Sequence, residues 1–172
     1  MDSITKEMRS ANMRAIHSKD TKPEVYLRKL LFARGLRYSL YSSKVPGKPD
    51  LYLRKYNTAV FVNGCFWHHH AGCRYGYIPK SNQEYWTGKF ERNRKRDQKV
   101  ASDLCKKHVR QIVIWECLIH KMKKNDELAN QVIETILAFL HSDHPFLELA
   151  DPFDPDALPI KSMQSENGET EG

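Results

Sequence analysis

The sequence lacks any long apolar run. No stretch approaches the roughly 20 consecutive apolar residues that span a bilayer, and the first ten residues, MDSITKEMRS, have no apolar core of a secretory signal. We therefore expect a cytoplasmic protein with no membrane partner.

Cysteine is also scarce, with four in 172 residues. In a reducing compartment such cysteines are more often metal ligands, reactive groups or small buried residues than disulfides.

Acidic residues are few in most of the chain. Eight of the 21 lie after residue 142, together with a single lysine, so residues 1–142 carry 27 basic and 13 acidic side chains and a formal charge of +14. Such a charge suits a polyanionic partner, and the interleaved aromatic residues favour nucleic acid. On this interpretation the protein is associated with the nucleoid. The alternative is a solvated basic surface with no such partner.

The length fits one domain with flanking segments. We expect an N-terminal arm over residues 1–20, a folded domain over residues 21–142, and an acidic tail over residues 143–172 whose prolines break any regular element. Apolar spacing and turn residues predict one or two helices near 81–107, other helices near 21–34 and 126–140, and strands near 37–41, 51–53, 58–62 and 111–115. This order is typical of an α/β fold with a mixed central sheet flanked by helices.

Two local patterns place acidic residues. Thr21 and Glu24 have the spacing of a helix capping box, so Glu24 has a sufficient structural explanation. A tight turn at residues 54–57 pairs antiparallel residues whose numbers sum to about 111 or 112. That register puts Asp50 near Val62 and Asn63, at the start of a segment rich in cysteine and histidine.

This segment, residues 58–73 (TAVFVNGCFWHHHAGC), predicts a metal site. A tetrahedral zinc ion needs four nitrogen or sulfur ligands. Cys65, Cys73 and either His69 or His70 supply three, and Cys117, after a predicted strand, is a better fourth ligand than Cys105. We expect Cys105 to be a small buried residue inside a helix. A zinc ion with four protein ligands is structural, because no position is left for substrate.

Three further residues together suit phosphodiester hydrolysis with magnesium. Asp50 can hold a hard cation, Glu24 is a second acid, and His68 can accept a proton from water near neutral pH. Taken singly each has an ordinary explanation, because a lone aspartate is usually a turn residue and a lone histidine a surface group.

Five short stretches resemble the very-short-patch-repair (Vsr) DNA mismatch endonucleases in order and spacing, over about residues 6–141. They are residues 12–16 (NMRAI), 46–50 (PGKPD), 62–70 (VNGCFWHHH), 93–97 (NRKRD) and 115–117 (WEC). The resemblance implies a restriction-endonuclease-like fold with a structural zinc and a catalytic Mg²⁺. It also implies an enzyme that nicks one DNA strand beside the T of a T·G mismatch, which arises when 5-methylcytosine deaminates.

The resemblance also implies roles for individual residues. Asp50 and the main-chain carbonyl of Val62 would hold Mg²⁺, Glu24 would orient water, and His68 would act as the general base. The zinc ligands implied are Cys65, His70, Cys73 and Cys117. The residues expected to contact DNA are Met13 in the N-terminal arm, Phe66, Trp67, Trp86, Lys89 and Asn93. Wedging aromatic groups at a wobble pair costs less than at a matched step, so the wedge provides selectivity. Core packing is the alternative for Trp67 and Trp86.

The chain departs from the family pattern in two places. Val62-Asn63 stands where the family pattern has Thr-His. A carbonyl ligand tolerates any side chain, but Asn63 cannot transfer a proton, so any catalytic role of Asn63 is reduced to hydrogen bonding. Ala71-Gly72 before Cys73 adds one residue, which leaves the choice between His69 and His70 open.

The expected partner is double-stranded DNA with a T·G mismatch, bound by a monomer, with mismatch-repair proteins and a cytosine methyltransferase of the same host as further partners. Two alternatives remain open from sequence. One is a restriction-type DNA endonuclease of different specificity, and the other is a zinc-stabilised DNA-binding protein without catalysis.

Overall fold

Five strands form one mixed sheet in the order β1-β2-β3-β4-β5. The structure is a computed structural model that describes residues 5, 7, 8, 10, 11 and 19–153. Its strands are β1 (Ser39–Leu40), β2 (Leu51–Leu53), β3 (Thr58–Asn63), β4 (Arg110–Trp115) and β5 (Phe146–Leu149). Strands β1, β2 and β3 pair antiparallel, whereas β3, β4 and β5 run parallel. The predicted mixed sheet is confirmed.

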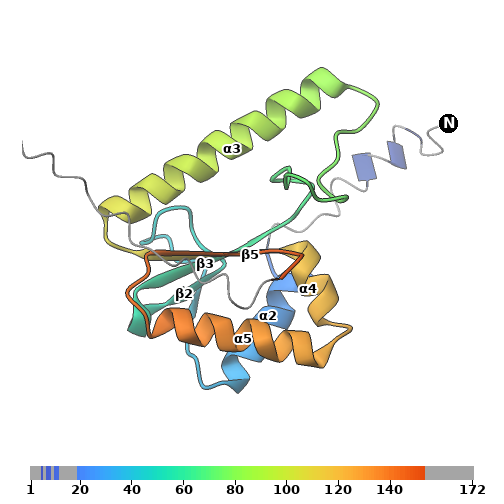
Figure 1. Ribbon diagram of the computed structural model, residues 1–172. Coiled ribbons are helices and arrows are strands. Elements are labelled where there is room, and N and C mark those ends of the chain that lie inside the picture. The colour runs from blue at the N-terminus through green and yellow to red at the C-terminus, as the bar shows by residue number, and fades with distance from the viewer. Residues whose placement is uncertain (1–4, 6, 9, 12–18, 154–172) are drawn as a thin grey trace, which may run out of the picture.

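Helices cover both faces of this sheet. Helices α2 (Lys22–Ala33), α4 (Glu116–Met122) and α5 (Asp126–Leu140) lie on one face, and α3 (Gln83–Lys106) crosses the other (Figure 1). None of the described helices is both long and apolar enough to span a bilayer. Most of the predicted N-terminal arm, including Met13, lies outside the described residues.

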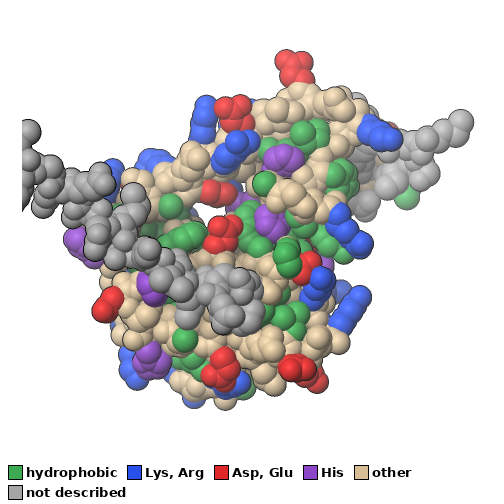
Figure 2. All heavy atoms as spheres, viewed as in Figure 1, with side chains coloured by type: hydrophobic (Ala, Val, Ile, Leu, Met, Phe, Trp, Pro, Cys, Tyr) green, Lys and Arg blue, Asp and Glu red, His purple; other side chains and the backbone are tan. Residues whose placement is uncertain are grey.

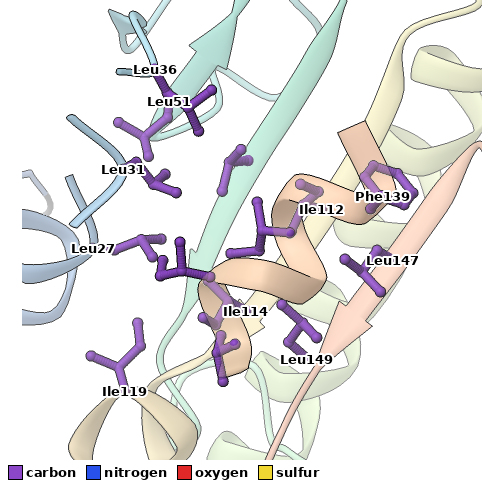
Figure 3. Close-up of a cluster of buried hydrophobic side chains, with 14 of the residues drawn as sticks. Leu27, Leu31, Leu36, Leu51, Ile112, Ile114, Ile119, Phe139, Leu147 and Leu149 are labelled. Carbon is purple, nitrogen blue, oxygen red and sulfur yellow. The ribbon is translucent and has the colours of Figure 1, made fainter. Parts of the chain in front are cut away.

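The main core lies between the sheet and α2, α4 and α5. Alternate residues of the central strands point to this side, among them Val60, Ile112 and Ile114, and they pack with leucines of α2 and β5 (Figure 3). Each fully buried leucine or isoleucine contributes roughly 1.5–3 kcal/mol through removal of its apolar surface from water. The other face has a smaller cluster, in which Leu104 of α3 packs with Val45 and Ala59.

Local signals were predicted well. Thr21 caps α2, because its Oγ1 accepts a hydrogen bond from the Glu24 amide at 3.4 Å, and Gly35 follows the helix with a φ of +80°. The β2–β3 pairs Leu51–Val60 and Leu53–Thr58 have numbers that sum to 111, as predicted. Asn57 closes this turn in the left-handed conformation.

Other expectations were wrong. Cys105 is exposed on α3, whereas it was expected to be a small buried residue. The seven-residue helix α4 was not predicted, because it starts directly after a strand and has no side-chain cap of its own. Strand β5 contradicts the expectation that no regular element follows Pro145. It pairs in parallel with β4 and buries Leu147 and Leu149.

Candidate functional site

A cleft opens at the edge of the sheet where β2 begins and β3 and β4 end. Its volume is about 650 Å³. Figure 2 shows acidic and histidine side chains gathered around the hollow between α3 and the rest of the protein. The polar residues that line the cleft include Glu24, Asp50, Asn63, His68, Asp97 and Glu116. The first four are candidate site residues from the sequence, and the structure brings them together in this cleft, whereas Asp97 and Glu116 were not singled out.

Asp50 is half-buried at the start of β2. Its Oδ2 accepts a hydrogen bond from the Val62 amide at 2.7 Å, as the predicted register required. Burial raises the pKa of Asp50 to about 6, and the nearby carboxylate of Glu24 adds to this rise. A hard divalent cation takes oxygen ligands and would offset both effects. The two carboxylates therefore fit a magnesium site.

His68 and Asp97 form a close pair across the cleft. His68 Nδ1 lies 2.5 Å from Asp97 Oδ2, so Asp97, from the middle of α3, holds the imidazole ring. When Nδ1 is protonated and donates a hydrogen bond to Asp97, Nε2 of the neutral imidazole has a free lone pair. Asp97 was missed because a lone aspartate in a highly charged helix looks like a surface residue. The only sequence signal was its place at the end of the 93–97 motif.

Glu24 lies on the first turn of α2 and is only 4% exposed. Its Oε2 accepts hydrogen bonds from the Asp20 amide, the Arg28 guanidinium and the Tyr41 hydroxyl. The capping explanation is therefore incomplete. Thr21 caps the helix through the Glu24 amide, while the Glu24 carboxylate belongs to a buried polar network.

Four metal-capable side chains converge beside the cleft. The ligand atoms of Cys65, His70, Cys73 and Cys117 all lie within 4.8 Å of one another. Burial raises the pKa of the Cys65 and Cys117 thiols, so their thiolate forms need a compensating charge. Two buried cysteines, a third cysteine and one histidine fit the donor set of a structural zinc ion.

The two neighbouring histidines differ. His70 stacks on Trp115 with ring centroids 4.0 Å apart, whereas His69 turns away and stacks on Phe90 at 5.0 Å. The backbone of His70 also lies against Gly76, where an added Cβ would meet the His70 carbonyl oxygen at 2.3 Å. The structure thus places His70 in the cluster and leaves His69 outside it.

Sequence comparison gives the relationship of the chain to known proteins. The family model described as DNA mismatch endonuclease Vsr matches residues 1–74. The type II nicking enzyme V.NmeAIP of Neisseria meningitidis is 44% identical over 135 residues, which cover 78% of this chain and 96% of that protein.

The chain belongs to the Vsr family of DNA mismatch endonucleases.

Two further relatives agree with this. The DNA mismatch endonuclease Vsr of Escherichia coli is 36% identical over 130 residues, covering 75% of this chain and 83% of that protein. The type II nicking enzyme V.XorIIP of Xanthomonas oryzae is 41% identical over 116 residues, covering 67% and 85%. As a Vsr endonuclease, the protein acts on DNA and is a nicking nuclease.

An aromatic cluster in this Vsr protein joins the cysteine- and histidine-rich loop to α3. Phe66 lies with its ring centroid 5.2 Å from both Trp67 and Trp86, and all three side chains are half-buried. Lys89 places its Nζ over the ring of Trp67, and Asn93 donates a hydrogen bond to the Trp67 carbonyl at 2.7 Å. Asn93 therefore holds the loop within the protein, while the rings remain partly accessible.

Asn63 and Glu116 complete the cleft of the Vsr site. Asn63 ends β3, paired with Trp115 of β4, and is half-buried. Glu116 follows Trp115 and opens α4, and a Cβ added to Gly64 would lie 3.6 Å from its Oε2. Glu116 lines the cleft, and Cys117, which was expected after a predicted strand, follows β4 and joins the metal-capable cluster.

Proposed function

We propose that this protein nicks the T-containing strand of a T·G mismatch by Mg²⁺-dependent hydrolysis and so initiates very short patch repair. The observation that carries the proposal is one cleft that combines Asp50, Glu24 and the His68–Asp97 pair at a single edge of the sheet. The name of the Escherichia coli relative supports a mismatched substrate. The names of the nicking enzymes support cutting of a single strand.

In this proposal Asp50 and the main-chain carbonyl of Val62 hold Mg²⁺. A magnesium ion there would stabilise the negative charge that develops on the scissile phosphate. Glu24 orients the attacking water, and His68 Nε2 accepts its proton. Asp97 holds the opposite nitrogen and stabilises the imidazolium that forms. The water oxygen bonds to phosphorus as the bond from phosphorus to the leaving oxygen breaks. The electron pair of that bond stays on the leaving oxygen, which takes a proton from solvent water.

The remaining predicted roles follow from the same arrangement. The four-residue cluster would hold a structural Zn²⁺ and fix the loop between β3 and α3, within a restriction-endonuclease-like fold. Phe66, Trp67 and Trp86 would enter the base stack beside the mismatch, with Lys89 near the phosphates. Asn63 would contribute hydrogen bonding only. Action as a monomer, with mismatch-repair proteins and a cytosine methyltransferase as partners, stays a prediction.

His68→Ala should lower the nicking rate by about 10²–10⁴-fold, the usual range for removal of a general base. Asp97→Asn should lower it by at least about tenfold, because the imidazolium loses its charged acceptor. Single-turnover nicking of a T·G duplex measures both. Asp103→Asn is the control, since Asp103 lies on the same helix but pairs with Lys99. Equal rates for Asp97→Asn and Asp103→Asn would remove Asp97 from the mechanism.

Trp67→Ala should reduce the preference for mismatched over matched DNA by about tenfold or more, because stacking on a base is worth roughly 1–3 kcal/mol. Competition binding with T·G and T·A duplexes measures the preference. Phe32→Ala is the control, since Phe32 is 52% exposed at the opposite end of α2 from Glu24. An unchanged preference in Trp67→Ala would assign this ring to packing alone.

The direct test of the function is nicking of a T·G duplex against its matched control, with and without Mg²⁺. Cutting of mismatch-free plasmid at defined sites would instead support a restriction-type nuclease of different specificity. Binding that weakens with salt but never leads to cleavage with any divalent ion would contradict the catalytic roles proposed above.

A further inference from the structure

A buried arginine sits behind the proposed catalytic carboxylate. Arg28 lies one helical turn after Glu24 and is 9% exposed. Its Nη2 donates to Glu24 Oε2 at 3.1 Å, and its Nη1 donates to Asp20 Oδ1 at 2.6 Å. A guanidinium this deeply buried needs such partners, because an unpaired buried charge is strongly unfavourable. Arg28 is thus fixed between two carboxylates, of which only Glu24 lines the cleft.

Tyr41 completes the network from a different element. Its hydroxyl donates to Glu24 Oε2 at 2.7 Å and accepts from Arg28 Nη2 at 2.5 Å and from the Asp20 amide at 2.6 Å. Burial, together with the hydrogen bond to Glu24, raises the pKa of Tyr41 to about 12, so the hydroxyl keeps its proton. The backbone of Tyr41 has a φ of +48°, which lies in the left-handed region. A residue other than glycine adopts this conformation only at an energetic cost.

The network leaves one face of the carboxylate open. Within the described part of the chain, all hydrogen bonds to the Glu24 carboxylate go to Oε2, from Asp20, Arg28 and Tyr41. Oε1 therefore has no partner among them. Glu24 lines the cleft together with Asp50, and Oε1 is the carboxylate oxygen left for a further hydrogen bond. Arg28 also lowers the pKa of Asp50, against the dominant effect of burial and the opposing effect of Glu24.

We propose that Arg28 and Tyr41 are positioning residues of the nicking reaction, which fix Glu24 through Oε2 so that Oε1 addresses the water beside Asp50. The inference rests on the proposed function, since it assumes that Glu24 acts in catalysis. It assigns a role to two residues that are not among those lining the cleft. Mutation of a group that holds an active-site residue in this way typically lowers metal affinity or activity by about 10–100-fold.

Tyr41→Phe is the sharpest variant, because it keeps the ring and removes the hydroxyl. The expected result is a 10- to 100-fold fall in the single-turnover nicking rate with unchanged affinity for the T·G duplex. Tyr38→Phe is the matched control, since the Tyr38 hydroxyl donates to the Arg28 carbonyl at 3.2 Å and not to Glu24. In a Glu24→Gln background, Tyr41→Phe should cause no further loss, because residues that act through one group are not additive.

Hydrogen exchange of the Asp20 amide provides a readout that needs neither magnesium nor DNA. This amide donates to both Glu24 Oε2 and the Tyr41 hydroxyl, so its protection should fall in Tyr41→Phe and remain in Tyr38→Phe. If Glu24→Gln abolishes nicking while Tyr41→Phe behaves like Tyr38→Phe in rate and exchange, the positioning role is wrong and the proposed function stands. If Glu24→Gln nicks normally, the role of Glu24 in the proposed function fails first.

Discussion

Asp50→Asn should abolish nicking and, at the same time, make the magnesium-free protein more stable. The loss of nicking is expected to exceed about 10³-fold, because the cation loses its charged ligand. The asparagine oxygen can still accept the hydrogen bond that Asp50 takes from the Val62 amide. The substitution therefore removes the charge while preserving the local geometry.

The gain in stability follows from the direction of the pKa shift. The pKa of Asp50 is about 6 in the folded protein, against 3.8 for an unperturbed aspartate, so the folded state binds the proton more tightly. Stability is then fully present at pH values below the unfolded pKa and falls as the pH rises through the folded pKa. The loss amounts to at most about 3 kcal/mol above pH 6. Asp50→Asn should recover that energy at pH 7.5 and abolish this pH dependence.

Thermal unfolding in magnesium-free buffer at pH 4 and pH 7.5 measures the effect. Chelators are unsuitable here because they would also remove zinc. At pH 7.5 the variant should melt up to roughly 6–12 °C above the wild type, at about 2–4 °C per kcal/mol for a chain of this size. Added Mg²⁺ should stabilise only the wild type. Unfolding of Asp50→Asn at both pH values would show instead that Asp50 is a structural turn residue.

Cys117→Ala should remove one equivalent of bound zinc and destabilise the whole site. Cys117 is buried in the first turn of α4, two residues after the end of β4, whereas Cys65 and Cys73 lie in the loop after β3. A metal shared by these residues ties the loop to the neighbouring strand. Structural zinc sites in small peptides bind with apparent free energies on the order of 10 kcal/mol, so the loss of a ligand should be large.

Metal analysis and circular dichroism melting measure this prediction, with nicking as a third readout. The chain provides its own control in Cys105, which is exposed on α3 and does not belong to the metal-capable cluster. Cys105→Ala should keep its zinc, its melting temperature and its activity. Full zinc content and unchanged melting in Cys117→Ala would mean that the four residues are only packed together.

The features predicted from sequence were those that local chemistry determines. The cap at Thr21, the turn at Asn57 and the register of β2 against β3 depend on residues within a few positions of one another. The approach of Asp50 to Val62 then followed from counting residue pairs outward from that turn. The four metal-capable residues were also predicted, because cysteine and histidine are rare and their chemistry is specific.

The features that were missed depend on contacts between distant segments. Asp97 reaches His68 only because α3 folds back over the sheet, and no local pattern distinguishes it from the other charged residues of that helix. In the sequence Arg28 resembles a solvated helix residue, because its hydrogen bond to Tyr41, thirteen positions later, forms only in the folded structure. Strand β5 was missed because it is short and follows a proline, and its stability comes from pairing with β4.

Residues 58–73 have three separate roles in this account. The end of β3 meets Asp50 at the proposed magnesium site, Phe66 and Trp67 form the aromatic cluster with α3, and Cys65, His70 and Cys73 join Cys117. His68 lies between the second and third of these groups and faces Asp97. A structural metal would therefore fix the distance between the general base and the aromatic wedge.

Strand-specific mismatch nicking can be measured with one duplex labelled on both strands and prepared with either a T·G or a C·G pair at the same position. We expect a magnesium-dependent nick on the T-containing strand, beside the T, and no cut in the C·G duplex or in the opposite strand. Equal cutting of both duplexes, or no nick in the T·G duplex with Mg²⁺ present, would contradict it.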